Sequence, residues 1–300
     1  MREGTRPLRS GLVTAVPAGG RHESSWAAAW RRLRRHRLAM LGMGIIAGIV
    51  LLAVFAPLVA PADPLAIDYA HPAVPPGVAG HLLGTDAIGR DILARLIYGT
   101  RVSLQVGLVA VGIAATLGTA VGLAAGYYGG WVDSVLMRTV DVFLAFPVIV
   151  LAIGIIAVLG PSLVNVMIAL GLVAWTTYAR VVRGQVLVLR ELEFVHAARA
   201  MGVGDWRILV RHVLPNTLAP IIVLATVGMA TAIIAEAALS FLGLGVQPPT
   251  PSWGTMLNEG RGFLRTAPHI STFPGLAIML TVLGFNFLGD GLRDALDPRL

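Results

Sequence analysis

Long apolar runs separated by short polar segments dominate the chain. A run of about 20 predominantly apolar residues is long enough to cross a bilayer as a helix. About six such runs are present, at residues 38–60, 103–125, 140–159, 163–182, 218–242 and 273–288. Pro161 separates the third run from the fourth and predicts a tight turn between them. The pattern therefore predicts an all-α, polytopic membrane protein with about six transmembrane helices.

Three longer segments interrupt the apolar pattern. Residues 61–101 are rich in proline and predict an external loop, and residues 243–270 predict a second one. Residues 183–216 carry alternating arginines and acids and predict a cytoplasmic segment. Because helix-to-helix turns are usually short, a polar segment of about 30 residues indicates structure of its own. We therefore expect one transmembrane domain over residues 38–300, with this segment between two of its helices.

The distribution of arginine predicts the orientation in the membrane. The net charge is +7, and residues 1–37 carry nine arginines against two acids. Such a cluster beside a membrane span is typical of a cytoplasmic flank. Cytoplasmic amino and carboxyl termini leave only five arginines outside: Arg90, Arg95, Arg101, Arg261 and Arg265. We therefore expect residues 1–37 to be an Arg-rich cytoplasmic segment, disordered over 1–25, where Gly, Ser and Pro are frequent.

The composition excludes several classes of chemistry. Hydrophobic residues make up 56% of the chain and charged residues 13%, whereas a soluble domain carries roughly 25% charged residues. The chain has no cysteine and no lysine. It therefore lacks thiol nucleophiles, thiolate metal sites and the lysine of a phosphate-binding loop. We expect no catalytic residue, no metal site and no cofactor in this chain.

The cytoplasmic segment has helical spacing of its own. From Glu193, small and apolar residues recur at Ala197, Ala200 and Met201, and Gly202 provides a stop. A second short amphipathic helix is predicted around Trp206, Leu209, Val210 and Val213, ending at Pro215. These helices form either solvated connectors or a docking surface for a cytoplasmic partner. The length of the segment favours docking.

Small residues recur within the second apolar run. Gly118, Gly122 and Gly126 are spaced four residues apart, a pattern that lets helix backbones approach closely. The contact is either within this chain or with a partner membrane subunit.

Two acids lie within or beside apolar runs, where a charge is costly. Asp141 follows Arg138 by three residues, which allows a local ion pair and favours a structural role. Glu236 has no basic neighbour at helical spacing and is the better candidate to line a pathway. We keep both Asp141 and Glu236 as candidates for a translocation pathway.

The stretch HAARAMGVGDWRILVRHVLP resembles the coupling motif of bacterial ABC-importer permeases. That pattern reads Glu-Ala-Ala, three residues, Gly, nine residues, Ile, one residue, Leu-Pro. The chain departs from it at His196, where the pattern has Glu, and at His212, where it has Ile. The resemblance implies contact with an ATPase subunit around Glu193, His196, Ala197, Ala198, Gly202, Leu214 and Pro215.

Four further stretches are similar to the dipeptide/oligopeptide/nickel branch of these permeases, and to its second, C-type membrane subunit. They read WRRLRRHRLAMLG, HLLGTDAIGRDILARLIYGTRVSL, ALSFLGLGVQPPTPSWGTML and NFLGDGLRDALDPRL. The resemblance covers about residues 30–300. It implies a type I ABC-importer permease fold in the bacterial inner membrane. It also implies a homologous second permease subunit, two ATPase subunits that hold ATP and Mg, and an external solute-binding protein; no nucleic acid is expected.

The substrate and one alternative class stay open. Dipeptides, longer peptides, glutathione-like compounds and nickel complexes all use permeases of this type, and the absence of a His, Cys or Met cluster in the spans favours peptides. A secondary transporter or channel would show inverted repeats and broken helices. The sequence shows no such repeat, and a long docking segment would have no purpose in such a protein.

Overall fold

The structure is a computed structural model that describes residues 25–296, and these residues fold into helices without a β-strand. Apart from Ser25, the segment predicted to be disordered, residues 1–25, lies outside the described residues. The α-helices are α1 Ser25–Arg35, α2 Arg37–Val54, α3 Ala56–Val59, α4 Ile92–Tyr128, α5 Gly130–Leu144, α6 Val148–Leu159, α7 Leu163–Leu189, α8 Glu193–Ala200, α9 Asp205–Ile208, α10 Leu214–Phe241, α11 Trp253–Gly260 and α12 His269–Leu296. A π-helical turn, Leu209–Val213, joins α9 to α10.

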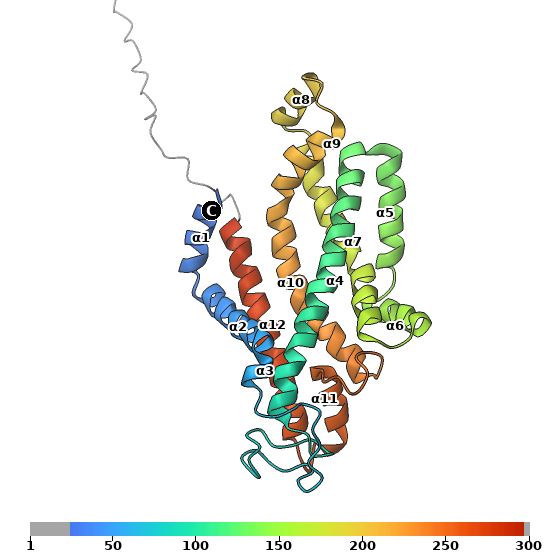
Figure 1. Ribbon diagram of the computed structural model, residues 1–300. Helices are drawn as coiled ribbons and strands as arrows, with labels where there is room; N and C mark the ends of the chain where they lie inside the picture. Colours follow the sequence, from blue (N-terminus) through green and yellow to red (C-terminus); the bar gives the residue numbers. More distant parts are fainter. Residues whose placement is uncertain (1–24, 297–300) are drawn as a thin grey trace, which may run out of the picture.

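Five helices are long and apolar enough to cross a membrane: α2, α4, α7, the continuous α9–α10 helix and α12. The bent pair of α5 and α6 makes up to six. Figure 1 shows α8 and α9 at one end of these helices, and α11 with the loop before α4 at the other. The prediction of about six spans in an all-α chain is therefore confirmed.

The predicted third span, residues 140–159, is wrong as a single straight helix. Two helices take its place, α5 and α6, and they meet at an angle of 89°. Pro147 is the N-cap residue of α6, and its missing N–H and fixed φ prevent α5 from continuing. The sequence pattern missed the start of α5 because Asp133, Arg138 and Asp141 interrupt its apolar positions.

Several helices extend beyond the apolar runs that predicted them. α4 begins at Ile92, within the predicted external loop, because the Asp91 carboxylate accepts from the backbone N–H of Ala94 at 2.7 Å and caps the helix. α7 continues to Leu189 and α12 begins at His269. The length of an apolar run matches the thickness of the hydrocarbon core of the bilayer. A helix with polar ends can continue past that core.

Pro215 does not end a helix, contrary to prediction. It lies in the first turn of α10, directly after the π-helical turn. The first residues of a helix need no intrahelical donor, so a proline is tolerated there. α9, the π turn and α10 therefore run on as one helix of 37 residues, from Asp205 to Phe241.

The most extensive helix contact is between α4 and α7, where three glycines of α4 face α7. A Cβ atom added at Gly118 would lie 2.4 Å from the carbonyl oxygen of Trp175, and one at Gly122 would lie 2.6 Å from that of Ala179. At Gly126 it would lie 2.7 Å from the Cβ of Val186. The glycine stripe therefore packs within this chain and brings two helix backbones together.

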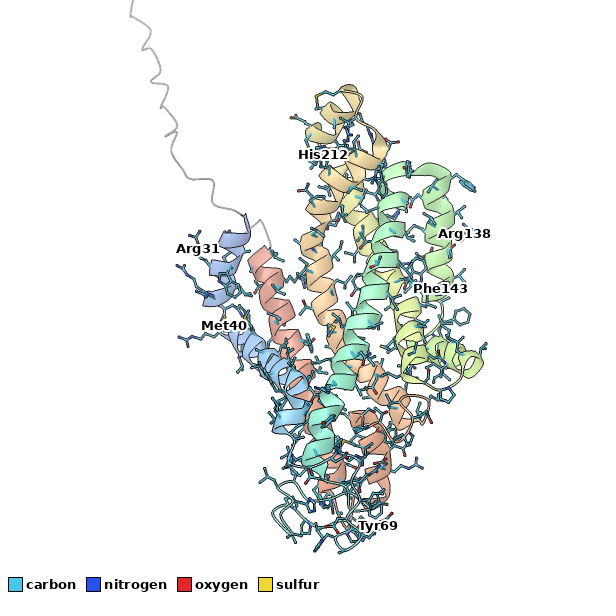
Figure 2. The ribbon with its side chains drawn as sticks, in the orientation of Figure 1. Arg31, Met40, Tyr69, Arg138, Phe143 and His212 are labelled. Atoms are coloured by element: carbon cyan, nitrogen blue, oxygen red, sulfur yellow. The ribbon has the colours of Figure 1, made fainter. Side chains whose placement is uncertain are left out.

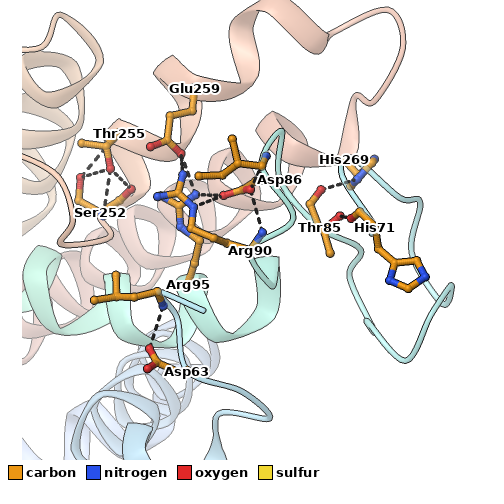
Figure 3. Close-up of polar contacts among 12 residues, drawn as sticks. Asp63, His71, Thr85, Asp86, Arg90, Arg95, Ser252, Thr255, Glu259 and His269 are labelled. Atoms are coloured by element: carbon orange, nitrogen blue, oxygen red, sulfur yellow. Dashed lines mark hydrogen bonds and ion pairs between the residues drawn. The ribbon is translucent and has the colours of Figure 1, made fainter. Parts of the chain in front are cut away.

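Buried charges stabilise the end of the molecule that contains α11 and the loop before α4 (Figure 3). Arg95 of α4 is 2% exposed and pairs with Asp86 of the preceding loop and with Glu259 of α11, the latter at 2.7 Å. Arg90 reaches the same two carboxylates at 2.6 and 2.9 Å. Removing one partner of a buried pair costs about 3–5 kcal/mol. The four charges therefore hold the loop, α4 and α11 together.

A leucine at Gly122 should separate α4 from α7. Overpacking of this kind typically costs about 1–3 kcal/mol, so we expect Gly122→Leu to lower the thermal unfolding temperature of the purified full chain in detergent. Gly112→Leu is the matched control, because nothing lies within 4 Å of the Cβ that it adds to the same helix. Equal unfolding temperatures for the two variants would contradict the assigned contact.

Candidate functional site

A short helical hairpin projects from the end of α7 (Figure 1). It consists of α8, a turn and α9, and we call it the coupling hairpin. α8 begins at Glu193, as the spacing predicts, and Gly202 has a φ of +75°. The N–H of Val203 donates to the carbonyl of Ala198 at 3.1 Å, and that of Gly202 donates to Arg199 at 2.9 Å. These two bonds form a Schellman motif, which needs a left-handed residue at the position of Gly202.

The inner face of the coupling hairpin is fastened to α4 and α7. Apolar side chains from the hairpin, the π-helical turn, α4 and α7 form one buried cluster: Tyr127, Val182, Val186, Val195, Ala198, Ile208, Leu209 and Val213. The Tyr127 hydroxyl donates to the Asp205 carboxylate at 2.7 Å, and the Arg199 guanidinium lies 4.8 Å from the Tyr127 ring centroid. The hairpin is thereby held to the transmembrane helices by side chains from both of its helices.

The outer face of the coupling hairpin exposes large apolar side chains beside polar and charged ones. Met201 is 76% exposed, and Trp206 is 77% exposed. Phe194 is 41% exposed, and its ring lies 6.5 Å from that of His212. Large apolar side chains this exposed at one tip are typical of a contact surface.

The residues predicted to contact an ATPase divide between the two faces. Glu193, His196, Ala197 and Gly202 are exposed on the hairpin, and Pro215 is exposed in the first turn of α10. Ala198 is only 2% exposed and packs inside the chain's own cluster. The expected ATPase contact at Ala198 does not fit this burial, because helical spacing alone does not show which face turns inward. Leu214 is partly buried at the start of α10.

Glu236 is fully buried in α10. Its Oε1 accepts from the Ser240 hydroxyl at 2.7 Å, and the Ser240 oxygen accepts from the backbone N–H of Val246 at 3.2 Å. The expectation that Glu236 lines an open pathway does not fit this burial. The acid instead supports the turn that follows α10.

Asp141 is exposed on α5 and pairs with Arg180 of α7 at 2.6 Å, instead of with Arg138 on its own helix. A second pair, Asp133 with Arg183, joins the same two helices at 2.6 Å. The predicted local pair is therefore wrong, because α5 packs antiparallel to α7 and offers a partner across the helix interface.

Two hollows lie along α10, and the sequence analysis identified neither. The first has a volume of about 290 Å³ and lies among α4, α6, α7 and α10. The second has a volume of about 750 Å³ and lies among α7, α10 and α12, at the end nearer the coupling hairpin. Leu224 and Val227 line both hollows. Their walls come from helices that are distant in the sequence, so no local motif predicts them.

Within the described part of the chain, no group of three or more His, Asp or Glu side chains is arranged to hold a metal ion.

Two family models match the chain. Residues 118–300 match the binding-protein-dependent transport system inner membrane component. Residues 24–76 match the N-terminal transmembrane domain of oligopeptide transport permease C.

Relatives match over nearly the whole length. The dipeptide transport system permease protein DppC of Alkalihalophilus pseudofirmus is 50% identical over 300 residues, which are 99% of this chain and 98% of that protein. The glutathione transport system permease protein GsiD is 49% identical in Escherichia coli O157:H7, over 97% of both chains. GsiD of Pectobacterium atrosepticum is 46% identical over 92% of this chain and 91% of its own length.

A solved structure shares the fold. An inward-facing conformation of the MetNI methionine ABC transporter aligns with a TM-score of 0.55 and 21% identity, over 68% of this chain and 96% of that chain. Helical architecture, family models and near full-length relatives agree. The chain belongs to the binding-protein-dependent transport system inner membrane components and is a permease subunit of the dipeptide/oligopeptide type of ABC importer.

Proposed function

We propose that this chain is the second, C-type permease subunit of an importer of short peptides. It pairs with a homologous permease subunit in the bacterial cytoplasmic membrane, and each subunit supplies half of the translocation pathway. The chemistry shared by its relatives supports this proposal, since one is named for dipeptides and others for glutathione, which is itself a tripeptide. The selectivity among peptides resides largely in the external binding protein.

The coupling hairpin carries the proposal. Its exposed Met201 and Trp206 form an apolar tip on a hairpin that is fastened by Tyr127 and Arg199 to the transmembrane helices. An ATPase subunit that grips this tip would transmit its own movement to α4 and α7. The partner supplies ATP hydrolysis and Mg, because this chain has no lysine for a phosphate-binding loop.

The proposed orientation places the coupling hairpin in the cytoplasm. Tyr69 lies in the loop at one end of the molecule, and His212 lies near the opposite end (Figure 2). Arg31 of α1 lies in the same half as His212 (Figure 2), where the positive-inside rule expects arginine. The loop before α4 and α11 then face outward, toward the binding protein.

Single cysteines test this orientation, because the chain has none of its own. Tyr69 is 83% exposed and Met201 is 76% exposed. A membrane-impermeant maleimide added to intact cells should label Tyr69→Cys and spare Met201→Cys, and permeabilised cells should label both. Labelling of Met201→Cys in intact cells would reverse the orientation.

Trp206→Ala tests the docking tip. Because Trp206 is exposed and outside the chain's packing, we expect normal amounts of chain in the membrane. Burial of a tryptophan at the centre of an interface is typically worth about 2 kcal/mol or more, so at least tenfold less ATPase subunit should co-purify. Trp131→Ala is the matched control, because Trp131 is 78% exposed on α5, outside the hairpin. Full retention of the ATPase in Trp206→Ala would exclude this tip as the docking site.

Uptake by the assembled complex tests the substrate class. In proteoliposomes, binding protein loaded with a dipeptide should accelerate ATP hydrolysis and produce ATP-dependent dipeptide uptake. The isolated chain should do neither. Transport of a non-peptide solute with no peptide uptake would contradict the proposed function.

A further inference from the structure

The larger of the two hollows, which we call the cytoplasmic cleft, contains two opposite charges. Asp290 and Arg293 of α12 both line it. They are three residues apart on one helix, so their Cβ atoms are about 5–6 Å from each other. Among residues 25–296, neither side chain has an ion-pair or hydrogen-bond partner. Both charges therefore remain available at the wall of the cleft.

The facing wall of the cleft, on α7 and α10, supplies neutral polar groups. Gln185 and Asn216 line it with their amide side chains, and the Asn216 Nδ2 already donates to the carbonyl of His212 at 2.6 Å, which leaves its Oδ1 as an acceptor. Pro220 also lines the cleft from within α10, and it has no N–H to donate to the carbonyl of Asn216 one turn earlier. This wall therefore presents two amide groups and a backbone carbonyl that lacks its usual helical donor.

Apolar side chains complete the cleft deeper in α10. Val223, Leu224 and Val227 line it, and the last two continue into the smaller hollow. Gly289 brings α12 close to α10 here, because an added Cβ would lie 2.9 Å from Cγ2 of Val227. An apolar wall with a few convergent polar groups and a volume of 750 Å³ is typical of a small-molecule site.

We propose that the cytoplasmic cleft binds a short peptide by its two free ends. The Asp290 carboxylate receives the terminal ammonium, and the Arg293 guanidinium receives the terminal carboxylate. The amides of Gln185 and Asn216 bind the peptide bond, and the wall of Val223 and Leu224 accepts apolar side chains. A dipeptide backbone spans about 7 Å, which suits two charged side chains on adjacent turns. This inference rests on the proposed function and adds a recognition site for the zwitterionic backbone.

Protection of an introduced cysteine tests the site. Val181→Cys is placed in the cleft, because Val181 of α7 lines it without a role in the proposed binding, and Val188→Cys on the same helix is the control, because Val188 is 65% exposed and does not line the cleft. The assembled complex, in lipid nanodiscs without nucleotide or binding protein, reacts with a maleimide in the presence of leucyl-leucine. A ligand at roughly ten times its Kd should slow labelling of Val181→Cys about tenfold and leave that of Val188→Cys unchanged.

Peptides with one blocked terminus test which terminus each of the two charged side chains binds. N-acetyl-leucyl-leucine lacks the ammonium, and leucyl-leucinamide lacks the carboxylate, so each should protect less than leucyl-leucine. In Asp290→Asn, leucyl-leucine should protect no better than N-acetyl-leucyl-leucine. In Arg293→Gln, leucyl-leucine should protect no better than leucyl-leucinamide. Asp294→Asn is the matched control, because Asp294 lies 3.7 Å from His36 and outside the cleft. Equal protection by free and doubly blocked peptides would overturn the proposal.

Other occupants give different results. If Val181→Cys is unreactive without peptide and deletion of residues 297–300 restores its reactivity, the chain's own end fills the cleft and the proposal is wrong. If the cysteine reacts in detergent but not in nanodiscs, lipid fills it and the proposal is also wrong. If the same preparation takes up peptide but peptide does not protect the cysteine, the cleft is not the peptide site and the proposed function still stands. If it takes up no peptide, the proposed function itself is wrong.

Discussion

Close packing of α4 against α7 is the contact on which the half of the molecule with the coupling hairpin depends. The hydrophobic effect does not drive helices together inside a bilayer, so close van der Waals packing has to do so. Gly118, Gly122 and Gly126 allow the two backbones to approach closely. The coupling hairpin follows directly from α7 and rests on Tyr127 at the end of α4. A change in the α4–α7 distance would therefore displace the hairpin.

The half of the molecule that contains α11 and the loop before α4 is stabilised differently. Here Arg90, Arg95, Asp86 and Glu259 form a largely buried charge network outside the predicted spans. Two arginines and two acids balance one another, which offsets the cost of burying charge. The contrast follows from the environment. A loop in contact with water can be held by ion pairs, whereas helices in lipid are held together by close packing of complementary surfaces.

The sequence predicted what depends on composition or local spacing. Apolar runs identified most spans, and the start of α8 and the stop at Gly202 followed from local periodicity. Features that depend on tertiary packing were missed. α5 is interrupted by charges that find partners on α7, and Ala198 and Glu236 are buried by elements distant in the chain. The cytoplasmic cleft is formed by three separate helices, so it exists only in the folded chain.

The continuous helix from Asp205 to Phe241 joins the proposed ATPase contact to the proposed peptide site. Trp206 lies near the start of this helix, and Asn216 and Pro220 line the cleft farther along. Regular hydrogen bonding is interrupted at two places along this stretch, at the π turn Leu209–Val213 and at Pro220. Helices bend most readily at such interruptions. A force applied at Trp206 would therefore tilt the wall that carries Asn216 against the charges on α12. Nucleotide state at the ATPase and peptide release from the cleft would then be linked through one helix.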